Sequence, residues 1–463
     1  MNYFRIIVFL LNRVIPMRIL CFLFLFNYAL GFSQSATFDY LPKNKDSVIV
    51  YIDAISDKKI RKFGDNYKKE IKENILDRKQ RFIEKIKDSS FVFNAEINNY
   101  LNSILNEIYN SNQITDKQEF YFFLDKSQIP NAACYGNGVF TINLGLFNFV
   151  NSDDELAFII CHEIAHYILE HNDKSLLQYF ETVNSKDIKK KIKKVEKQEY
   201  GKRKAYSELM EELNYNFLKR SQNVEIEADS LGFVLFKNTQ YNVAASTSSL
   251  KNLELADKAV FNEKSNLSKH FNFENYPFKD SWLQKDETLF DLSKKSDDYI
   301  KDSDSISTHP AIPIRVDKLK AMISNSIPQK SENKSRLSAI KKIVAYISIK
   351  TFIDANKIDL ALYQCLIMYN QQLIDKEMYV DIVSKLLKKT YELKEAHTFG
   401  RFVSPMYPFS DEVHLNEVKQ FLHNLELKSV RKIGLNFCLF NENLIKETID
   451  FKNTLQFFQN LNP

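Results

Sequence analysis

The stretch Ile159-Ile160-Cys161-His162-Glu163-Ile164-Ala165-His166-Tyr167 carries the pattern His-Glu-x-x-His inside an apolar run. Residues four apart on a helix project from one face, so a helix here would present the imidazoles of His162 and His166 together. Two such imidazoles supply half of a tetrahedral zinc site, and Glu163 can act as general base on a water molecule there. The stretch therefore predicts a zinc-binding helix, although two ordinary histidines of an amphipathic helix would give the same pattern.

The residues on either side support the helix. Ser152-Asp153-Asp154-Glu155 has the pattern of a capping box, with acidic residues in the first turn. Most positions from Leu156 to Leu169 are apolar, as expected of a helix inside the protein. Cys161 would point about 100° away from His162 and is expected in the core.

A second stretch, Asn223 to Gly232, contains Glu225, Ala228 and Asp229. Zinc hydrolases often combine two histidines with a carboxylate, and Glu225 could supply it. Asp229, one turn later, could accept the free ring N–H of a ligating histidine. Ala228 and Gly232 are small enough for two helices to approach closely. The alternative interpretation is a charged, solvated helix face.

Two further motifs complete a resemblance. The segment from Asn131 to Leu146 contains Asn-Ala followed by Gly138 and Gly-Leu, and Thr308-His309-Pro310 is followed by Arg315. In this order the four motifs resemble the gluzincin metallopeptidase family of HtpX, the CAAX prenyl protease and BepA. The resemblance covers roughly residues 95 to 320, about half of the chain.

The resemblance implies an α+β, mostly α-helical fold: a zincin-like metalloprotease domain with a small β-sheet. It implies one zinc ion per chain, held by His162, His166 and Glu225, with Glu163 as catalytic base and Asp229 behind the ligands. His309 would lie close to the metal, as an oxyanion contact or a fourth ligand; a helix-start His-Pro turn without a catalytic part is the alternative. Arg315 is expected to anchor the fold by ion pairing.

Strands are predicted near residues 48–52, 119–124 and 139–144, and helices over about 65–87 and 93–109. We expect the edge of the small sheet to lie along the substrate cleft, where an extended peptide could add by main-chain hydrogen bonds. Gly138, Val139 and Phe140 are the predicted substrate-binding residues. An edge covered by a loop is the alternative.

Composition excludes several classes of protein. The chain has 463 residues, 44% of them hydrophobic, with a formal charge of +5. Residues 1–33 carry three arginines and no acids, so the remainder carries about +2, and no basic stripe indicates nucleic-acid binding. Five cysteines without a Cys-x-x-Cys pair predict neither a disulfide scaffold nor a zinc ribbon.

Residues 1–33 resemble a signal peptide in pattern: arginines precede the apolar run Ile19 to Gly31, which ends in Ala29-x-Gly31. We therefore expect export to the periplasm or outside the cytoplasmic membrane. A retained membrane anchor is the alternative, although the run is shorter than the ~20 residues of a membrane span.

The rest of the chain is expected to form a metallopeptidase domain over residues 34–323 and a C-terminal all-helical domain over residues 336–463, separated by a polar linker. Residues 173–219 are expected to form a charged helical insert. Three roles are open for it: a lid, a basic contact to lipid or substrate, or a solvated helix face. The aromatic-rich segment 261–307 is a lid or pocket wall, or packs on its surroundings.

These patterns predict an exported zinc metalloendopeptidase acting on polypeptides, such as misfolded envelope proteins. One alternative is a latent or non-proteolytic metal-bearing chaperone that binds envelope proteins through its C-terminal helices. The other is a helical interaction protein without metal. Membrane association is possible but not required, and no nucleic-acid partner is expected.

Overall fold

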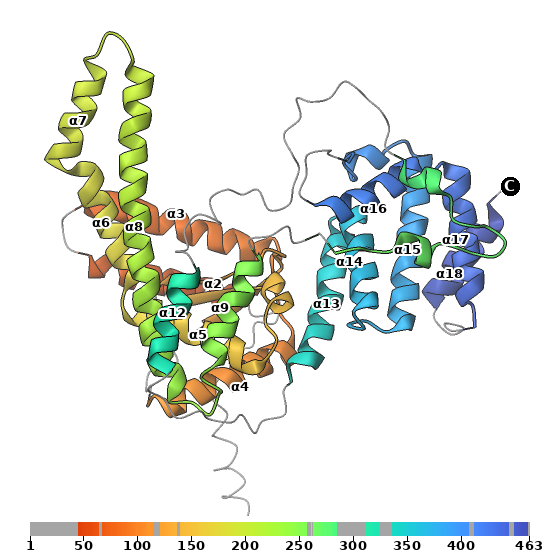
Figure 1. The fold of residues 1–463 in the computed structure, drawn as a ribbon, viewed down its shortest axis with the longest axis horizontal. Coiled ribbons are helices and arrows are strands. Elements are labelled where there is room, and N and C mark those ends of the chain that lie inside the picture. Colours follow the sequence, from red (N-terminus) through yellow and green to blue (C-terminus); the bar gives the residue numbers. More distant parts are fainter. Residues whose placement is uncertain are drawn as a thin grey trace, which may run out of the picture.

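The computed structural model describes residues 45–63, 67–113, 121–136, 139–256, 261, 263–284, 312–323, 336–406, 412–443 and 449–461. Within them the chain is mostly helical with one four-stranded sheet, which confirms the predicted fold class. Figure 1 shows two helical bodies, one around α5 and the sheet and one made of the C-terminal helices. None of the described helices has the length and apolarity that crossing a membrane requires.

The sheet has the order β1-β2-β4-β3, with β2 parallel to β4 and the other pairs antiparallel. Its strands are β1 (Phe91–Val92), β2 (Tyr121–Asp125), β3 (Ala132–Gly136) and β4 (Val139–Asn143). Helices cover both faces: Val139 packs against α2 and α3 on one face, and Phe140 packs against α4 and α5 on the other. β4 is therefore an interior strand, and β1 and β3 form the two edges.

The predicted strand at residues 48–52 is wrong. These residues belong to helix α2 (Lys45–Lys62), followed by α3 (Lys68–Lys87) and α4 (Ala95–Ser111). Val48 and Ile52, four residues apart, are buried while Val50 is 68% exposed, which is helical spacing. A short β-branched run cannot be assigned from periodicity alone, and burial against Phe82 decided it here.

The motif helix is α5 (Asp153–Ile168), and every residue from Glu155 to Ala165 is buried. The Ser152 hydroxyl accepts a hydrogen bond from the Glu155 N–H, as the capping box predicts. The Glu155 carboxylate instead accepts from the Asn151 N–H and from Ser248 and Asn252 of α9 (Ala245–Ala256). The N-terminal end of α5 is thus fixed at the cap and from a neighbouring helix.

The predicted helical insert is confirmed: α6 (His171–Asn184), α7 (Lys186–Glu196) and the first half of α8 (Lys202–Lys237). The second half of α8 packs along α5. At their closest point a Cβ on Gly232 would lie 2.9 Å from the His162 Cα. The prediction that small residues allow this close approach is confirmed.

The C-terminal body contains α13 (Leu337–Asp354), α14 (Ile358–Asn370), α15 (Lys376–Glu395), α16 (Val413–Asn424), α17 (Leu427–Asn441) and α18 (Ile449–Asn460). α14 and α15 pack together as a helical hairpin, and Asp375 caps α15. The two bodies meet along α13, because Ile340 packs into the core around α5 and Ile349 into the C-terminal core.

The described part of the aromatic segment, residues 261 and 263–284, belongs to the C-terminal core. It includes α10 (Leu267–His270) and the 3-10 turn η4 (Asp280–Leu283), and Trp282 packs on Phe421 of α16. Of the two alternatives, a lid or packing on the surroundings, these described aromatic residues follow the second. A stretch so rich in aromatic side chains gains more by burial than by exposure.

Candidate metal centre

Helices α5 and α8 bring three predicted ligands to one point. Nε2 of His162 lies 3.0 Å from Nε2 of His166. The Glu225 carboxylate oxygens lie 3.5 Å from each of these nitrogens, and Glu225 is 8% exposed. Among the described residues, the side chains of His162, His166 and Glu225 form a group able to hold a metal ion.

The spacing fits a tetrahedral cation. Ligand atoms about 2.0–2.1 Å from zinc at tetrahedral angles are about 3.3 Å apart, close to the 3.0 and 3.5 Å found here. Two neutral nitrogens and a carboxylate are also a donor set that zinc prefers. The residues present therefore fit the metal.

Buried ion pairs fix Asp229 and Glu225 on α8. Arg315 of α12 (Ile312–Ile323) donates from Nε and Nη2 to the two Asp229 oxygens, at 2.6 and 2.7 Å. Its Nη1 lies 3.3 Å from Glu225. Nδ1 of His162 lies 3.0 Å from Asp229. Arg315 is thus placed as the predicted ion-pairing anchor, and Asp229 lies behind His162 as predicted.

The electrostatics favour a positive charge between the histidines. Burial lowers the pKa of His162, but Asp229 and Glu225 outweigh it and raise the pKa to about 10. Burial and the neighbouring His162 lower the pKa of His166 to about 3. Although burial raises the pKa of Asp229, Arg315 and His162 bring it below the ordinary value, so Asp229 stays ionised. Such a pocket suits a cation facing two ring nitrogens.

Sequence reasoning missed His171 and Glu227. Nδ1 of His171 lies 2.9 Å from Nδ1 of His166, and its Nε2 lies 3.3 Å from the Glu227 carboxylate. His171 is 5% exposed. The signal was present in the sequence, because His171 follows His166 by five residues and Glu227 is next but one to Glu225.

The remaining predicted residues, those for catalysis and substrate binding, have different outcomes. Glu163 is 8% exposed on α5, directly after His162. His309 and Gly138 lie outside the described residues. Val139 and Phe140 are buried in β4, which is paired on both sides, so their main chain cannot accept an added strand. That form of substrate binding is wrong for these two residues, because the edge strand on that side of the sheet is β3.

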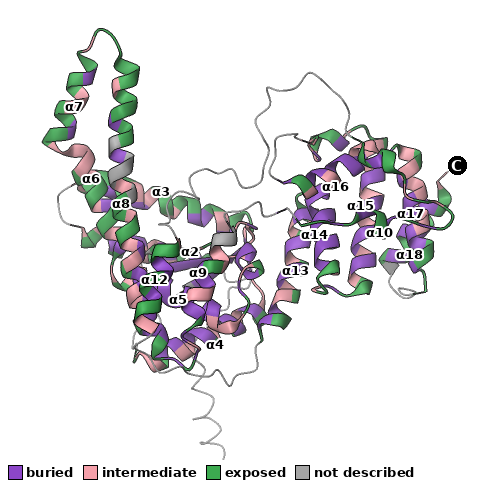
Figure 2. Cartoon of the chain, viewed as in Figure 1, coloured by how far each residue is buried: buried purple, intermediate pink, exposed green. Residues whose placement is uncertain are grey.

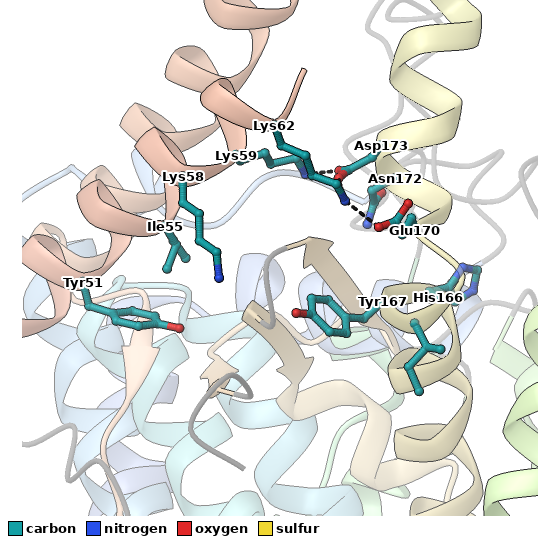
Figure 3. A pocket seen from close by; sticks show the side chains of 11 residues that line it. Tyr51, Ile55, Lys58, Lys59, Lys62, His166, Tyr167, Glu170, Asn172 and Asp173 are labelled. Atoms are coloured by element: carbon teal, nitrogen blue, oxygen red, sulfur yellow. Dashed lines mark hydrogen bonds and ion pairs between the residues drawn. The ribbon is translucent and has the colours of Figure 1, made fainter. Parts of the chain in front are cut away.

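A cavity of about 390 Å³ opens beside His166 between α2 and the junction of α5 with α6 (Figure 3). Tyr51 and Lys58 line it from α2, and Tyr167 lines it from α5. In its wall Lys59 and Lys62 of α2 pair with Asp173 and Glu170. Asn172, also in the wall, donates to the Cys134 carbonyl of β3 at 2.6 Å, so the sheet edge is covered at that point.

Residues 95–323, which contain the three candidate metal ligands and Glu163 but not the α2 wall of the cavity, match peptidase family M48. This part of the chain belongs to that family, and the protein is a metallopeptidase, a hydrolase of peptide bonds in polypeptides. A search of curated proteins found no match.

Proposed function

We propose that the protein is a zinc-dependent endopeptidase in which His162, His166 and Glu225 hold the metal and Glu163 is the general base. The observation that carries the proposal is the triangle of donor atoms, 3.0 to 3.5 Å apart, built from two helices. Membership of family M48 supports the same assignment.

Each residue of the centre has a distinct task. Zinc, when bound, polarises the scissile carbonyl and lowers the pKa of an attacking water molecule. The Asp229 carboxylate, 3.0 Å from Nδ1 of His162, favours the proton at that nitrogen and leaves the Nε2 lone pair toward His166 and Glu225. Glu163 takes the proton of the attacking water and passes it to the nitrogen of the leaving amine.

Substrates are proposed to be unfolded polypeptides that enter through the cavity beside His166. Its volume of about 390 Å³ accommodates a few side chains but no folded protein. The tyrosines of its wall offer apolar contact with polar ends. Export, with misfolded envelope proteins as substrates, is proposed from the pattern of residues 1–33 and from the family resemblance.

A metal-bearing chaperone remains the second candidate. The C-terminal helices have a core of their own and, among the described residues, supply no side chain to the metal centre. They are therefore free to bind an envelope protein. The Glu163→Gln variant distinguishes the two functions, because it removes the base and leaves the helices intact: a chaperone keeps full function in this variant.

Zinc content of the purified full chain tests the metal centre. We expect one zinc ion per chain in the wild type, and loss of zinc in His162→Ala and Glu225→Ala. The control is His397→Asn, an exposed histidine with φ 55°, a conformation that asparagine tolerates. Unchanged zinc content in His162→Ala would show that the metal is held elsewhere.

A further inference from the structure

Helix α7 and the first turns of α8 form an arm that extends beyond the rest of the molecule (Figure 1). The arm is held together by a small apolar seam of its own, in which Ile188 packs with Leu209 and Leu213, and with Ile192 and Phe217 at its margin. Figure 2 shows that the outer surface of both helices is largely exposed. The arm therefore projects from the molecule with a largely exposed outer side.

The arm concentrates the positive charge of the protein. Its basic part, residues 186–204, contains ten basic and three acidic residues, a net charge of +7, while the whole chain carries +5; the next turns of α8 add Glu208, Glu211 and Glu212, so residues 186–217 together carry +4. The chain outside residues 186–204 thus carries about −2. Nine of the ten basic residues are lysines. A charge so concentrated on one projection creates a local field that the balanced remainder of the surface does not have.

Helical geometry places the lysines of α7 on one side. Ile188 and Ile192 pack in the seam against α8, and Val195, on the same side of α7, is buried. At 100° per residue, five lysines fall on the opposite side: Lys186, Lys189, Lys190, Lys193 and Lys194, all exposed. Asp187 and Glu196 fall at the margins of this side, so its centre is uniformly positive.

The tip of the arm carries an exposed aromatic residue. Tyr200, in the turn between α7 and α8, is 89% exposed, more than any other exposed large hydrophobic residue described. The next residue, Gly201, has φ +75°, which turns the chain into α8. Tyrosine prefers the boundary between water and the lipid headgroups, because its ring is apolar and its hydroxyl polar.

We propose that this basic arm, residues 186–204, docks the protein on the surface of an anionic lipid membrane. The arm is convex, so it suits a broad, flat, negatively charged surface better than a nucleic-acid duplex, which basic grooves and arginine forks recognise. Clusters of lysines attract anionic lipid through long-range charge, and the tyrosine ring adds contact at the headgroups. Docking does not depend on the metal centre.

Vesicle sedimentation of the full chain tests the proposal. We expect binding to phosphatidylcholine vesicles that contain phosphatidylglycerol, loss of binding at high salt, and no binding to phosphatidylcholine alone. Each lysine near an anionic surface contributes about a fivefold gain in partitioning. We therefore expect partitioning onto these vesicles to fall by more than about a hundredfold in the variant Lys189→Glu/Lys190→Glu/Lys193→Glu/Lys194→Glu.

The matched control changes four exposed lysines elsewhere: Lys69→Glu/Lys72→Glu/Lys87→Glu/Lys318→Glu. Both variants change the net charge by the same amount, so the comparison distinguishes an effect of the arm from an effect of net charge. We expect the control to retain most of its binding to anionic vesicles. Equal loss in both variants would overturn the proposal. Binding of the wild type to polyglutamate but not to the anionic vesicles would assign the arm to an acidic polypeptide and also overturn it.

Tyr200→Trp gives a second readout and disturbs no packing, because Tyr200 is 89% exposed. The natural tryptophan, Trp282, is 4% exposed in the C-terminal core and shielded from quenchers. A tryptophan at the tip should be quenched by acrylamide in solution and protected, with a blue shift, on anionic vesicles. Unchanged quenching in the presence of vesicles that bind the protein would show that the tip does not contact lipid.

Discussion

Nδ1 of His166 and Nδ1 of His171 face each other at 2.9 Å, so one proton lies between them. Nε2 of His166 faces Glu225, which leaves Nδ1 as the protonated atom of His166 if Nε2 is to bind a metal. His171 must then accept at Nδ1 and donate from Nε2 to Glu227, 3.3 Å away. The chain His166–His171–Glu227 therefore fixes the tautomer of a proposed ligand.

Loss of this acceptor should weaken the metal site. We expect His171→Leu to lower zinc affinity by about 10–100-fold, measured by competition with a chelator. In His171→Asn the amide oxygen can replace Nδ1 as acceptor, and most of the affinity should return. If asparagine and leucine lower the affinity equally, His171 only fills space.

Gly232 allows α8 to lie against α5. A Cβ there would meet the Cα of His162 at 2.9 Å and its backbone nitrogen at 3.1 Å, so Gly232→Ala must separate the helices. We expect a loss of about 1–3 kcal/mol in unfolding free energy, together with weaker zinc binding. Gly400→Ala is the control, because its Cβ would have no neighbour within 4 Å. Equal stability of both variants would show that the helices can part freely.

Arg315 neutralises two buried carboxylates. Arg315→Met leaves Asp229 and Glu225 without their positive partner. We expect the free energy of unfolding, measured with denaturant, to fall by about 3–5 kcal/mol. Arg315→Lys keeps the charge but not the bidentate hydrogen bonding, so its free energy of unfolding should lie between those of Arg315→Met and the wild type. Lys318→Met, at an exposed position on the same helix, should change stability by less than about 0.5 kcal/mol. An Arg315→Met variant as stable as this control would contradict the assignment.

Because His270 is buried, we expect the stability of the C-terminal body to depend on pH. Burial lowers its pKa to about 4, and Nδ1 of the neutral ring is 2.9 Å from the Tyr379 hydroxyl. Because the unfolded chain binds this proton more tightly, stability is fully present above about pH 6.5 and falls as the pH approaches 4. The loss is of the order of 3 kcal/mol.

Trp282 reports on the same core, so its fluorescence can follow unfolding by denaturant at each pH. His270→Gln has no proton to gain, and its amide oxygen can still accept from Tyr379. The variant should lose stability less steeply between pH 6.5 and pH 4 than the wild type does. Parallel curves for the two proteins would assign the pH dependence to other groups.

The metal centre could be predicted where local spacing determines geometry. Residues four apart on a helix must share a face, so the pairing of His162 with His166 followed from the sequence alone. Glu225 and Asp229 were candidates from their residue types and one-turn spacing, and the family resemblance then supported the same roles. The small residue Gly232 gave a physical reason for the close helix contact.

Other features depend on contacts between distant segments, which spacing does not reveal. The run at residues 48–52 has strand composition, but burial against α3 made it helical. Val139 and Phe140 were assigned to a sheet edge, but β3 pairs outside them, and no periodicity distinguishes an edge strand from its neighbour. The His171–Glu227 contact joins residues 56 positions apart.

The central claim is that Glu163 supplies the base for peptide hydrolysis at a metal held by its helix neighbours. The most direct measurement is the rate of cleavage of an unfolded polypeptide by wild type and Glu163→Gln at equal zinc content. We predict that the rate of cleavage falls at least about a hundredfold in Glu163→Gln while zinc is retained. Cleavage by Glu163→Gln at the wild-type rate would contradict the account.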